Sequence, residues 1–274
     1  MTPRPELRRR LLGLAYRMLG SAADAEDVLQ DAWLKVRDVE GVADETGYMV
    51  TVVTRLCLDR LRSAPARRET YVGPWLPEPI ATTDEVDPES VSLAFVALLE
   101  RLSPVERAVF VLKQVFELEH AEIARALGLG DAATRQLFVR AKAHVESERP
   151  RFAPSREAHE RLLSAFLLAC AAGDVEGLKS MLASDARATT DSGGKVRAAR
   201  NVLRGSDAVA RFFVGITRKG AADGVSVEVR DVNGWPAAVL SRGGTVESVL
   251  VLETDGAVVL GVSVVSNPDK LGAV

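Results

Sequence analysis

Three long polar side chains on one predicted helix have the chemistry to read a nucleic acid. Arg135, Gln136 and Arg140 lie in the segment from Glu119 to Val145, whose pattern predicts a short helix, a glycine-bearing turn and a longer helix. An arginine can donate two hydrogen bonds to a guanine, and a glutamine can pair with an adenine, in the major groove. The pattern is therefore typical of a helix-turn-helix that reads DNA.

Apolar spacing predicts the buried side of both helices. Ile123, Ala124 and Leu127 share one face of the first helix. The second helix repeats apolar residues every four positions, at Ala133, Leu137, Ala141 and Val145. Upstream, Ser103 and Glu106 form a capping-box pattern that predicts a supporting helix.

An amphipathic helix with an acidic outer face is predicted near the start of the chain. Its cap signal is Ser21 with Asp24, and its buried side carries Ala25, Val28, Leu29, Ala32, Trp33 and Val36. Its outer face carries Asp24, Glu26, Asp27, Gln30 and Asp31. Such a face suits a basic protein partner and repels phosphates, although a merely solvated face is an equal alternative.

A second helix in the same block changes from apolar to basic. Met49, Val53, Leu56 and Cys57 predict its buried side, and the arginines that follow are Arg55, Arg60, Arg62, Arg67 and Arg68, with Asp59 as the one acid among them. These cations suit phosphates or unpaired bases. A solvated helix end is the alternative.

The bulk composition limits the choice of function. The chain has 274 residues and a formal net charge of −3, whereas a free-standing DNA-binding protein usually carries a basic excess. Either DNA is not the partner, or another protein supplies much of the affinity. Cys57 and Cys170 lack partner motifs, which favours a reduced cytoplasmic setting. We identify no metal-ligand spacing, phosphate-binding loop, export signal or membrane segment.

The connector and the C-terminal part differ in character from the helical blocks. Tyr71 to Pro88 is rich in proline and acids and should be extended, and the apolar Trp75 within it should dock onto another domain. From Ser155 a helical stretch precedes valine-rich alternating segments. Their turn signals are Asn233-Gly234, Gly243-Gly244 and Asp255-Gly256, which predict three or four antiparallel strands.

Six short motifs carry a resemblance to a known family. DAEDVLQDAWLKV (24–36), RLCLDRLRS (55–63) and EIARALGLGDAATRQLFVRAKAHV (122–145) resemble regions 2 and 4 of extracytoplasmic-function (ECF) sigma factors of the sigma-70 family, the promoter-recognition subunits of bacterial RNA polymerase. The tail resembles a SnoaL-like domain. WLPEP (75–79) and NPDKL (267–271) resemble motifs of the sigma factors that carry this tail, and DSGGK (191–195) resembles their DGGGK loop with one serine substitution.

The resemblance implies a multidomain fold. Two all-α domains, sigma region 2 at 1–70 and a region 4 helix-turn-helix at 91–150, flank a linker at 71–90. An α+β SnoaL-like cone with a curved antiparallel sheet follows at 151–274. Implied partners are core RNA polymerase, through its β′ coiled coil and β flap, and promoter DNA. A cytoplasmic monomer without cofactor, metal or membrane contact is expected.

The resemblance also assigns expected roles to residues. Core polymerase would contact Asp24, Glu26, Asp27, Gln30 and Asp31. The −10 element would contact Arg55, Asp59, Arg60, Arg62, Arg67 and Arg68. The −35 element would contact Ala132, Arg135, Gln136, Val139, Arg140 and Lys142. Regulation between domains would involve Trp75, Leu76, Pro77, Glu78, Pro79, Asp191, Gly193, Gly194, Lys195, Asn267, Pro268, Asp269, Lys270 and Leu271.

Catalysis by the tail is the weaker expectation. SnoaL-like enzymes do acid-base chemistry with histidine or aspartate, but the three histidines here are His120, His144 and His159, none of them in the predicted strands. Asp191, Asp207 and Asp231 are the remaining acid candidates, without an evident partner. We therefore expect a fused regulator and no catalytic residue. The alternative is a helix-turn-helix regulator that acts without polymerase, fused to a small-molecule-binding or isomerase-like domain.

Overall fold

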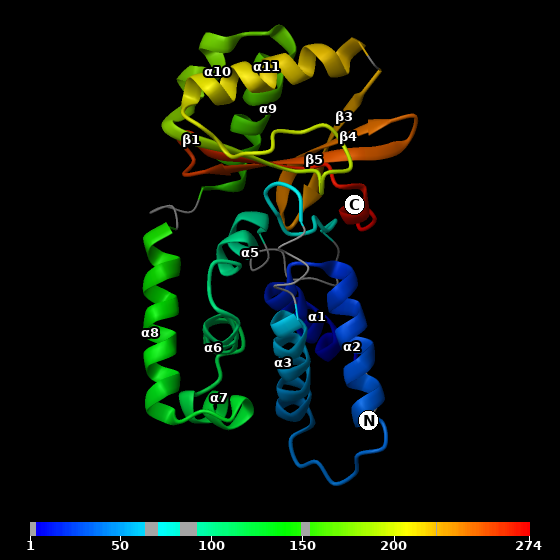
Figure 1. Ribbon diagram of the computed structural model, residues 1–274, viewed down its shortest axis with the longest axis vertical. Coiled ribbons are helices and arrows are strands. Elements are labelled where there is room, and N and C mark those ends of the chain that lie inside the picture. The colour runs from blue at the N-terminus through cyan, green and yellow to red at the C-terminus, as the bar shows by residue number, and fades with distance from the viewer. Residues whose placement is uncertain (1–3, 64–70, 83–91, 149–153, 223) are drawn as a thin grey trace. The chain divides into compact units, whose positions relative to one another are not determined.

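The computed structural model describes residues 4–63, 71–82, 92–148, 154–222 and 224–274. The chain divides into two compact units (Figure 1). The helical unit comprises Met1–Thr70 and Thr83–Arg149, and the α+β unit comprises Tyr71–Thr82 and Pro150–Val274. Residues 71–82 therefore belong with the C-terminal part of the chain, although helices flank them in the sequence.

The first three helices pack against one another around their apolar sides. They are α1 (Pro5–Leu19), α2 (Ala22–Val36) and α3 (Glu45–Ser63). The hydroxyl of Ser21 caps α2 by accepting a hydrogen bond from the backbone N–H of Asp24 at 3.1 Å. The buried residues of α2 are Ala25, Val28, Leu29, Ala32 and Val36, and Trp33 is only half-buried. The predicted register is thus confirmed apart from Trp33.

Four more helices are present in the described part of the helical unit. They are α5 (Leu93–Leu99), α6 (Pro104–Gln114), α7 (His120–Leu127) and α8 (Asp131–Glu148). The capping box of Ser103 and Glu106 is present at the start of α6. α7 ends at Gly128, whose φ of 68° lies in the left-handed region that glycine tolerates. The predicted helix-turn-helix is therefore formed by α7 and α8.

The buried register of α8 differs from the prediction in its first turn. Ala133 is exposed and Leu137 half-buried, whereas Thr134 is fully buried. The Thr134 hydroxyl donates a hydrogen bond to the Gly130 carbonyl at 3.1 Å, so this polar side chain faces the core with its donor satisfied. Ala141 and Val145 are buried as predicted.

The described residues of the α+β unit form three α-helices, a six-stranded sheet and a short 3-10 helix. The helices are α9 (Arg156–Ala172), α10 (Val175–Met181) and α11 (Ser206–Ala222). The strands are β1 (Leu182–Asp191), β2 (Leu203–Arg204), β3 (Ser226–Val232), β4 (Trp235–Arg242), β5 (Thr245–Thr254) and β6 (Val259–Val265), in the sheet order β2-β1-β6-β5-β4-β3. All three predicted turns join neighbouring antiparallel strands.

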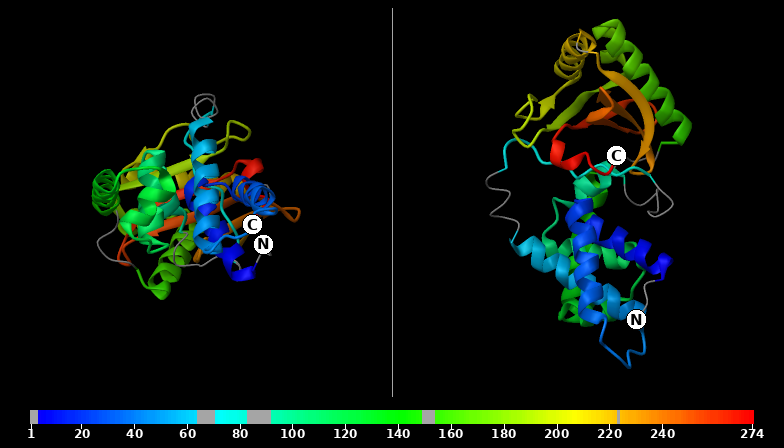
Figure 2. Two further views of the ribbon diagram at one scale, coloured as in Figure 1. Left: turned by 90° about the horizontal axis from the view of Figure 1, so that it is seen from below. Right: turned by 90° about the vertical axis from the view of Figure 1, so that its right-hand side faces the viewer.

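The sheet has more strands than the sequence predicted, and it is mixed. β1 and β6 run parallel, and every other neighbouring pair is antiparallel. The three helices lie against one face of the curved sheet (Figure 2). Phe166 of α9 and Phe213 of α11 meet there edge to face, with ring centroids 5.2 Å apart, and both are buried. Among the described residues, no helix combines the length and apolar character needed to cross a membrane.

Candidate nucleic-acid and protein interfaces

The second helix of the helix-turn-helix leaves one side open to solvent. The exposed residues of α8 include Ala132, Arg135, Gln136, Val139, Arg140 and Lys142. Val139 is 65% exposed although it is apolar, and it lies among the polar side chains. The Arg140 guanidinium lies 3.4 Å from the Glu106 carboxylate, a surface ion pair that an incoming anion can replace. The arrangement offers hydrogen-bond donors together with an apolar contact for a thymine methyl group.

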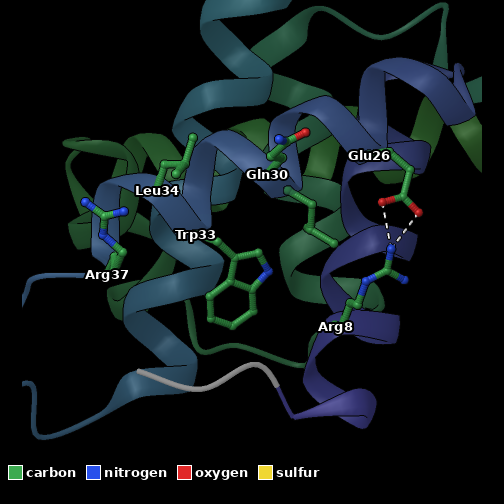
Figure 3. Close-up of a pocket in the computed structure, with 7 residues that line it drawn as sticks. Arg8, Glu26, Gln30, Trp33, Leu34 and Arg37 are labelled. Carbon is green, nitrogen blue, oxygen red and sulfur yellow. Dashed lines mark hydrogen bonds and ion pairs between the residues drawn. The ribbon is translucent and has the colours of Figure 1, made fainter.

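The outer face of α2 combines acids with a groove. Glu26, Asp27, Gln30 and Asp31 are exposed, and Asp24 is half-buried. Beside them lies a groove of about 410 Å³ (Figure 3). Its lining residues are Arg8, Glu26, Leu29, Gln30, Trp33, Leu34 and Arg37.

Apolar side chains make this groove a surface suited to another protein. Leu34 is 58% exposed, and the indole of Trp33 lines the groove beside it. Both oxygens of the Glu26 carboxylate accept hydrogen bonds from Arg8, at 2.9 and 2.8 Å, which ties α2 to α1. Sequence reasoning missed the groove because Trp33 fits the buried period. The sequence signal for the groove was Leu34, an aliphatic residue that does not fit the spacing of the buried residues of α2.

The arginines of α3 have different surroundings. Arg60 contacts the acids of α2, at 2.6 Å from Asp24 and 3.4 Å from Asp27. Its guanidinium therefore neutralises part of the acidic face, and the expected contact of Arg60 with DNA stays a prediction. Arg62 is exposed and pairs with the exposed Asp59 at 3.1 Å.

Arg55 contributes to packing within the helical unit. Its Nε donates a hydrogen bond to the carbonyl oxygen of Ala126, near the C-terminal end of α7, at 2.9 Å. A cation at a helix C-terminus also interacts favourably with the helix dipole. The other two expected −10 residues, Arg67 and Arg68, lie outside the described residues.

In the α+β unit, Asp191 at the end of β1 joins the connector to the domain. Its carboxylate is fully buried and accepts hydrogen bonds from the backbone N–H of Leu76 at 2.8 Å and of Gly193 at 3.1 Å. The Tyr71 hydroxyl donates to the same carboxylate. Burial, followed by this hydrogen bond, raises the pKa of the Tyr71 hydroxyl above its ordinary value.

Lys270 supplies the positive charge at this site. Its Nζ lies 2.8 Å from Asp191 Oδ2 and donates a hydrogen bond to the Leu76 carbonyl at 2.6 Å. The ammonium also lies over the rings of Trp75 and Tyr71, 4.1 and 5.1 Å from their centroids. Two aromatic faces and a carboxylate thus surround one cation. We call this group of Tyr71, Trp75, Leu76, Asp191 and Lys270 the clasp.

A second set of contacts anchors the other end of residues 71–82. The backbone N–H of Ile80 donates to the Asn233 side-chain oxygen at 3.1 Å, and the backbone N–H of Asn233 donates to the Ile80 carbonyl at 2.8 Å. Thr82 bonds to the carbonyl of Asp231 and to the N–H of Gly234. Sequence reasoning missed Tyr71 and Asn233, since the Asn-Gly pair reads only as a turn.

The remaining motif residues surround the clasp. Of these, Pro77, Glu78, Pro79, Asn267 and Leu271 are buried. Asn267 donates to the Tyr71 hydroxyl at 3.0 Å, and Lys195 pairs with Asp269. Pro268 starts a short 3-10 helix, Pro268–Lys270, that presents the lysine. The structure therefore brings the WLPEP, DSGGK and NPDKL motifs together. Gly193 and Gly194, both at positive φ, leave room for Asn267 and Val72 respectively.

Chemistry-bearing residues elsewhere in the α+β unit are engaged in packing. His159 is buried, contacts the carbonyl of Pro236 at 3.1 Å and lies 5.2 Å from Trp235 between ring centroids. Burial raises the pKa of the Cys170 thiol to about 12, which leaves it protonated and unreactive. Across the described ranges, no group of three or more His, Cys, Asp or Glu residues is arranged to hold a metal ion.

Comparisons with known proteins match both helical blocks of the chain. A model of sigma-70 region 2 matches residues 6–67, and one of sigma-70 region 4 matches residues 92–145. The ECF RNA polymerase sigma factor SigJ of Mycobacterium tuberculosis is 42% identical over 223 residues, which cover 78% of this chain and 72% of the relative. The probable ECF sigma factor SigI of the same species is 30% identical over 272 residues, 95% and 91% of the two chains.

A solved structure extends the similarity to the whole chain. The crystal structure of Mycobacterium tuberculosis SigJ superposes with a TM-score of 0.79 at 34% sequence identity. The match covers 97% of this chain and 96% of that chain. It therefore includes the α+β unit as well as the helices.

Proposed function

Because the chain belongs to the ECF RNA polymerase sigma factors and carries a fused SnoaL-like, NTF2-like domain, we propose that its two interfaces bind core polymerase and promoter DNA separately. The α2 face would contact polymerase, and α8 would contact the −35 element. The exposure of all six expected contact residues on α8 is the observation that carries the proposal. The protein would act as a monomer in the cytoplasm and without catalysis of its own.

The α2 face fits the basic coiled coil of the β′ subunit. Glu26, Asp27 and Asp31 supply charge, and the groove lined by Trp33 and Leu34 supplies apolar area. Interfaces of this kind depend on a few buried anchors, with the charges setting orientation and association rate. Trp33 is therefore the side chain that should contribute most to the affinity. The β flap would bind the region 4 helices.

The promoter contacts divide between the two sigma regions. On α8, Arg135 or Arg140 would pair with guanine, Gln136 with adenine and Val139 with a thymine methyl group. Lys142, two residues after Arg140, would contact phosphate. On α3, Arg62 remains exposed for the −10 strand, whereas Arg60 is occupied by the acids of α2. A modest net charge suits this division, since polymerase supplies much of the DNA affinity.

The α+β unit would regulate the distance between the two sigma regions. The clasp and the Asn233 anchor fix residues 71–82, which lie between those regions in the sequence. A linker with both ends fixed has fewer conformations than a free one. Holding or releasing it would therefore change how the −10 and −35 contacts are made together.

Co-elution with bacterial core RNA polymerase tests the proposal. The variant Asp27→Arg/Asp31→Arg should lose co-elution, because it places two cations opposite a basic coiled coil. The matched control Glu157→Arg/Glu176→Arg reverses two exposed charges on the α+β unit and should co-elute normally. A folded wild-type chain that never binds core would overturn the proposal and favour a regulator that acts without polymerase.

Trp75→Ala tests the regulatory part. It removes an aromatic face from Lys270 and leaves the sequences of α2 and α8 unchanged. Promoter activity should change while core co-elution stays intact. Transcription at the wild-type level would count against a role for the clasp.

A further inference from the structure

Two arginines face each other on the edge of the sheet in the α+β unit. Arg187 of β1 and Arg204 of β2 are direct partners in the antiparallel register, and both side chains are exposed. Opposed residues in such a pair have Cβ atoms about 5 Å apart, so two like charges there destabilise the strand pairing. Because this pair of arginines destabilises the fold, we look for its role in binding rather than in folding.

The segment between these strands adds further positive charge. Residues 187–204 contain five cations and one acid, in a chain whose formal net charge is −3. The acid is Asp191, which is buried in the clasp, and Lys195 is paired with Asp269. The remaining four are Arg187, Arg197, Arg200 and Arg204, which are all exposed. We call these four the arginine face.

None of the four arginines forms an ion pair with an acid among the residues that the structure describes. Asp185, two positions before Arg187, is exposed and forms no ion pair with it among the residues described. Glu253, the next acid across the sheet, lies beyond Gly261 in the register and engages other groups. The arginine face therefore has the charge and spacing to bind a run of anions.

We infer that the arginine face binds the phosphate backbone of duplex promoter DNA between the −10 and −35 elements. The inference rests on the proposed function, which brings DNA to the helical unit on both sides of the connector. Arginine suits this role because its planar fork donates two hydrogen bonds to a phosphate. Backbone contacts of this kind position a protein on DNA without reading its sequence.

Chain length supports the choice of this DNA. Eight Cα steps separate Ser63 at the end of α3 from Tyr71, and ten separate Thr82 from Ser92 before α5. Fully extended, these chains reach at most about 28 and 35 Å. Along B-DNA that is roughly one helical turn at 3.4 Å per base pair. The α+β unit is thus tethered close to the duplex that lies between the two sigma contacts.

The test measures binding of holoenzyme to duplex promoter DNA as a function of salt. Full-length Arg187→Gln/Arg204→Gln is assembled with core polymerase and compared with wild type. Each lost phosphate contact should reduce the slope of log affinity against log salt by about 0.9, so the slope should fall by about 2. Affinity at low salt should fall on the order of tenfold. The variant should melt at or above the wild-type temperature, since it removes a like-charge pair.

The matched control is Arg218→Gln/Lys219→Gln, which removes two exposed cations from α11. It should keep the wild-type slope. An unchanged slope in Arg187→Gln/Arg204→Gln, or an equal loss in the control, would overturn the inference.

A second DNA substrate tests whether the arginine face binds duplex DNA or an acidic protein surface. On a downstream fork that lacks the duplex between the two elements, wild type and Arg187→Gln/Arg204→Gln should bind equally. Loss on that fork, or weaker co-elution with core, would show that the arginine face binds an acidic protein surface instead. A wild-type chain that forms no holoenzyme would overturn the proposed function and this inference with it, whereas normal holoenzyme with an unchanged slope would overturn this inference alone.

Discussion

The ammonium of Lys270 lies 2.8 Å from the carboxylate of Asp191, and both are removed from solvent: the side chains are 12% and 0% exposed. A buried ion pair repays its desolvation only when the remaining polar atoms are also satisfied. Here the connector supplies the further hydrogen bonds. The backbone N–H of Leu76 donates to Asp191, and the carbonyl oxygen of Leu76 accepts from Lys270. The connector is therefore part of the fold of the α+β unit.

Replacing Asp191 with Asn should release the connector. The variant removes the carboxylate that lies 2.8 Å from the buried Lys270 ammonium, a loss of about 3–5 kcal/mol in unfolding free energy. The amide proton of Leu76 should also exchange much faster with solvent. Denaturant unfolding and hydrogen exchange measure the two effects. The control Asp269→Asn breaks the exposed pair with Lys195 and should cost about 0–1 kcal/mol. Equal costs in both variants would contradict the prediction.

Replacing Gly194 with Ala should separate the connector from the DSGGK loop. A Cβ at Gly194 would lie 2.8 Å from the Cβ of Val72, closer than such atoms approach. The control is Gly244→Ala, which has a similar positive φ, 83° against 74°, and open space around it. Both variants carry the backbone cost of about 1 kcal/mol. Only Gly194→Ala should also increase protease cleavage within residues 71–82, and equal cleavage would show that the contact does not hold the connector.

The sequence predicted that the connector would dock onto another part of the chain. It did not predict which polar groups hold the connector there. An apolar Trp75 in a polar linker is a sound reason to expect docking, because exposed aromatic surface is unfavourable in water. The central residue, Asp191, was not predictable as a buried charge. In DSGGK an aspartate before two glycines reads as a turn residue, and its partner Lys270 lies 79 residues away.

The sequence pattern also did not predict which strands pair with each other in the sheet. Alternating valines predict strands and Asn-Gly predicts a hairpin, but neither identifies a partner distant in the sequence. β1 and β6 are separated in the sequence by α11 and four strands, so no turn signal indicates that they pair or that they run parallel. The first turn of α8 failed for a related reason, since Thr134 satisfies its hydroxyl within the helix and is buried despite being polar.

His159 should make the α+β unit sensitive to acid. Burial is the main cause that lowers the pKa of this imidazole below its ordinary 6.5. The unfolded chain therefore takes up the proton more readily than the folded chain, so stability is complete above about pH 6.5 and falls as the pH drops below it. His159→Gln keeps a donor for the Pro236 carbonyl but does not titrate. The variant should therefore flatten the dependence of the unfolding free energy on pH between pH 5.5 and 6.5. Urea unfolding across pH 5.5–8 measures it, with the exposed His144→Gln expected to behave as wild type.

Arg107 should be the most costly charge to remove from the helical unit. The residue is 2% exposed, and its Nη1 lies 2.5 Å from both the Glu100 carboxylate and the Met18 carbonyl of α1. Arg107→Met removes the cation that lies 2.5 Å from the buried Glu100 carboxylate, which should cost about 3–5 kcal/mol in denaturant unfolding.

The double variant Arg107→Met/Glu100→Gln separates charge from packing. The double variant also removes the buried negative charge that lost its arginine, so more than half of the lost stability should return. The Met18 carbonyl stays without its donor in both variants, which accounts for the part that does not return. If the double variant is as unstable as Arg107→Met alone, then the arginine stabilises α6 against α1 through packing of its side chain rather than through its pair with Glu100.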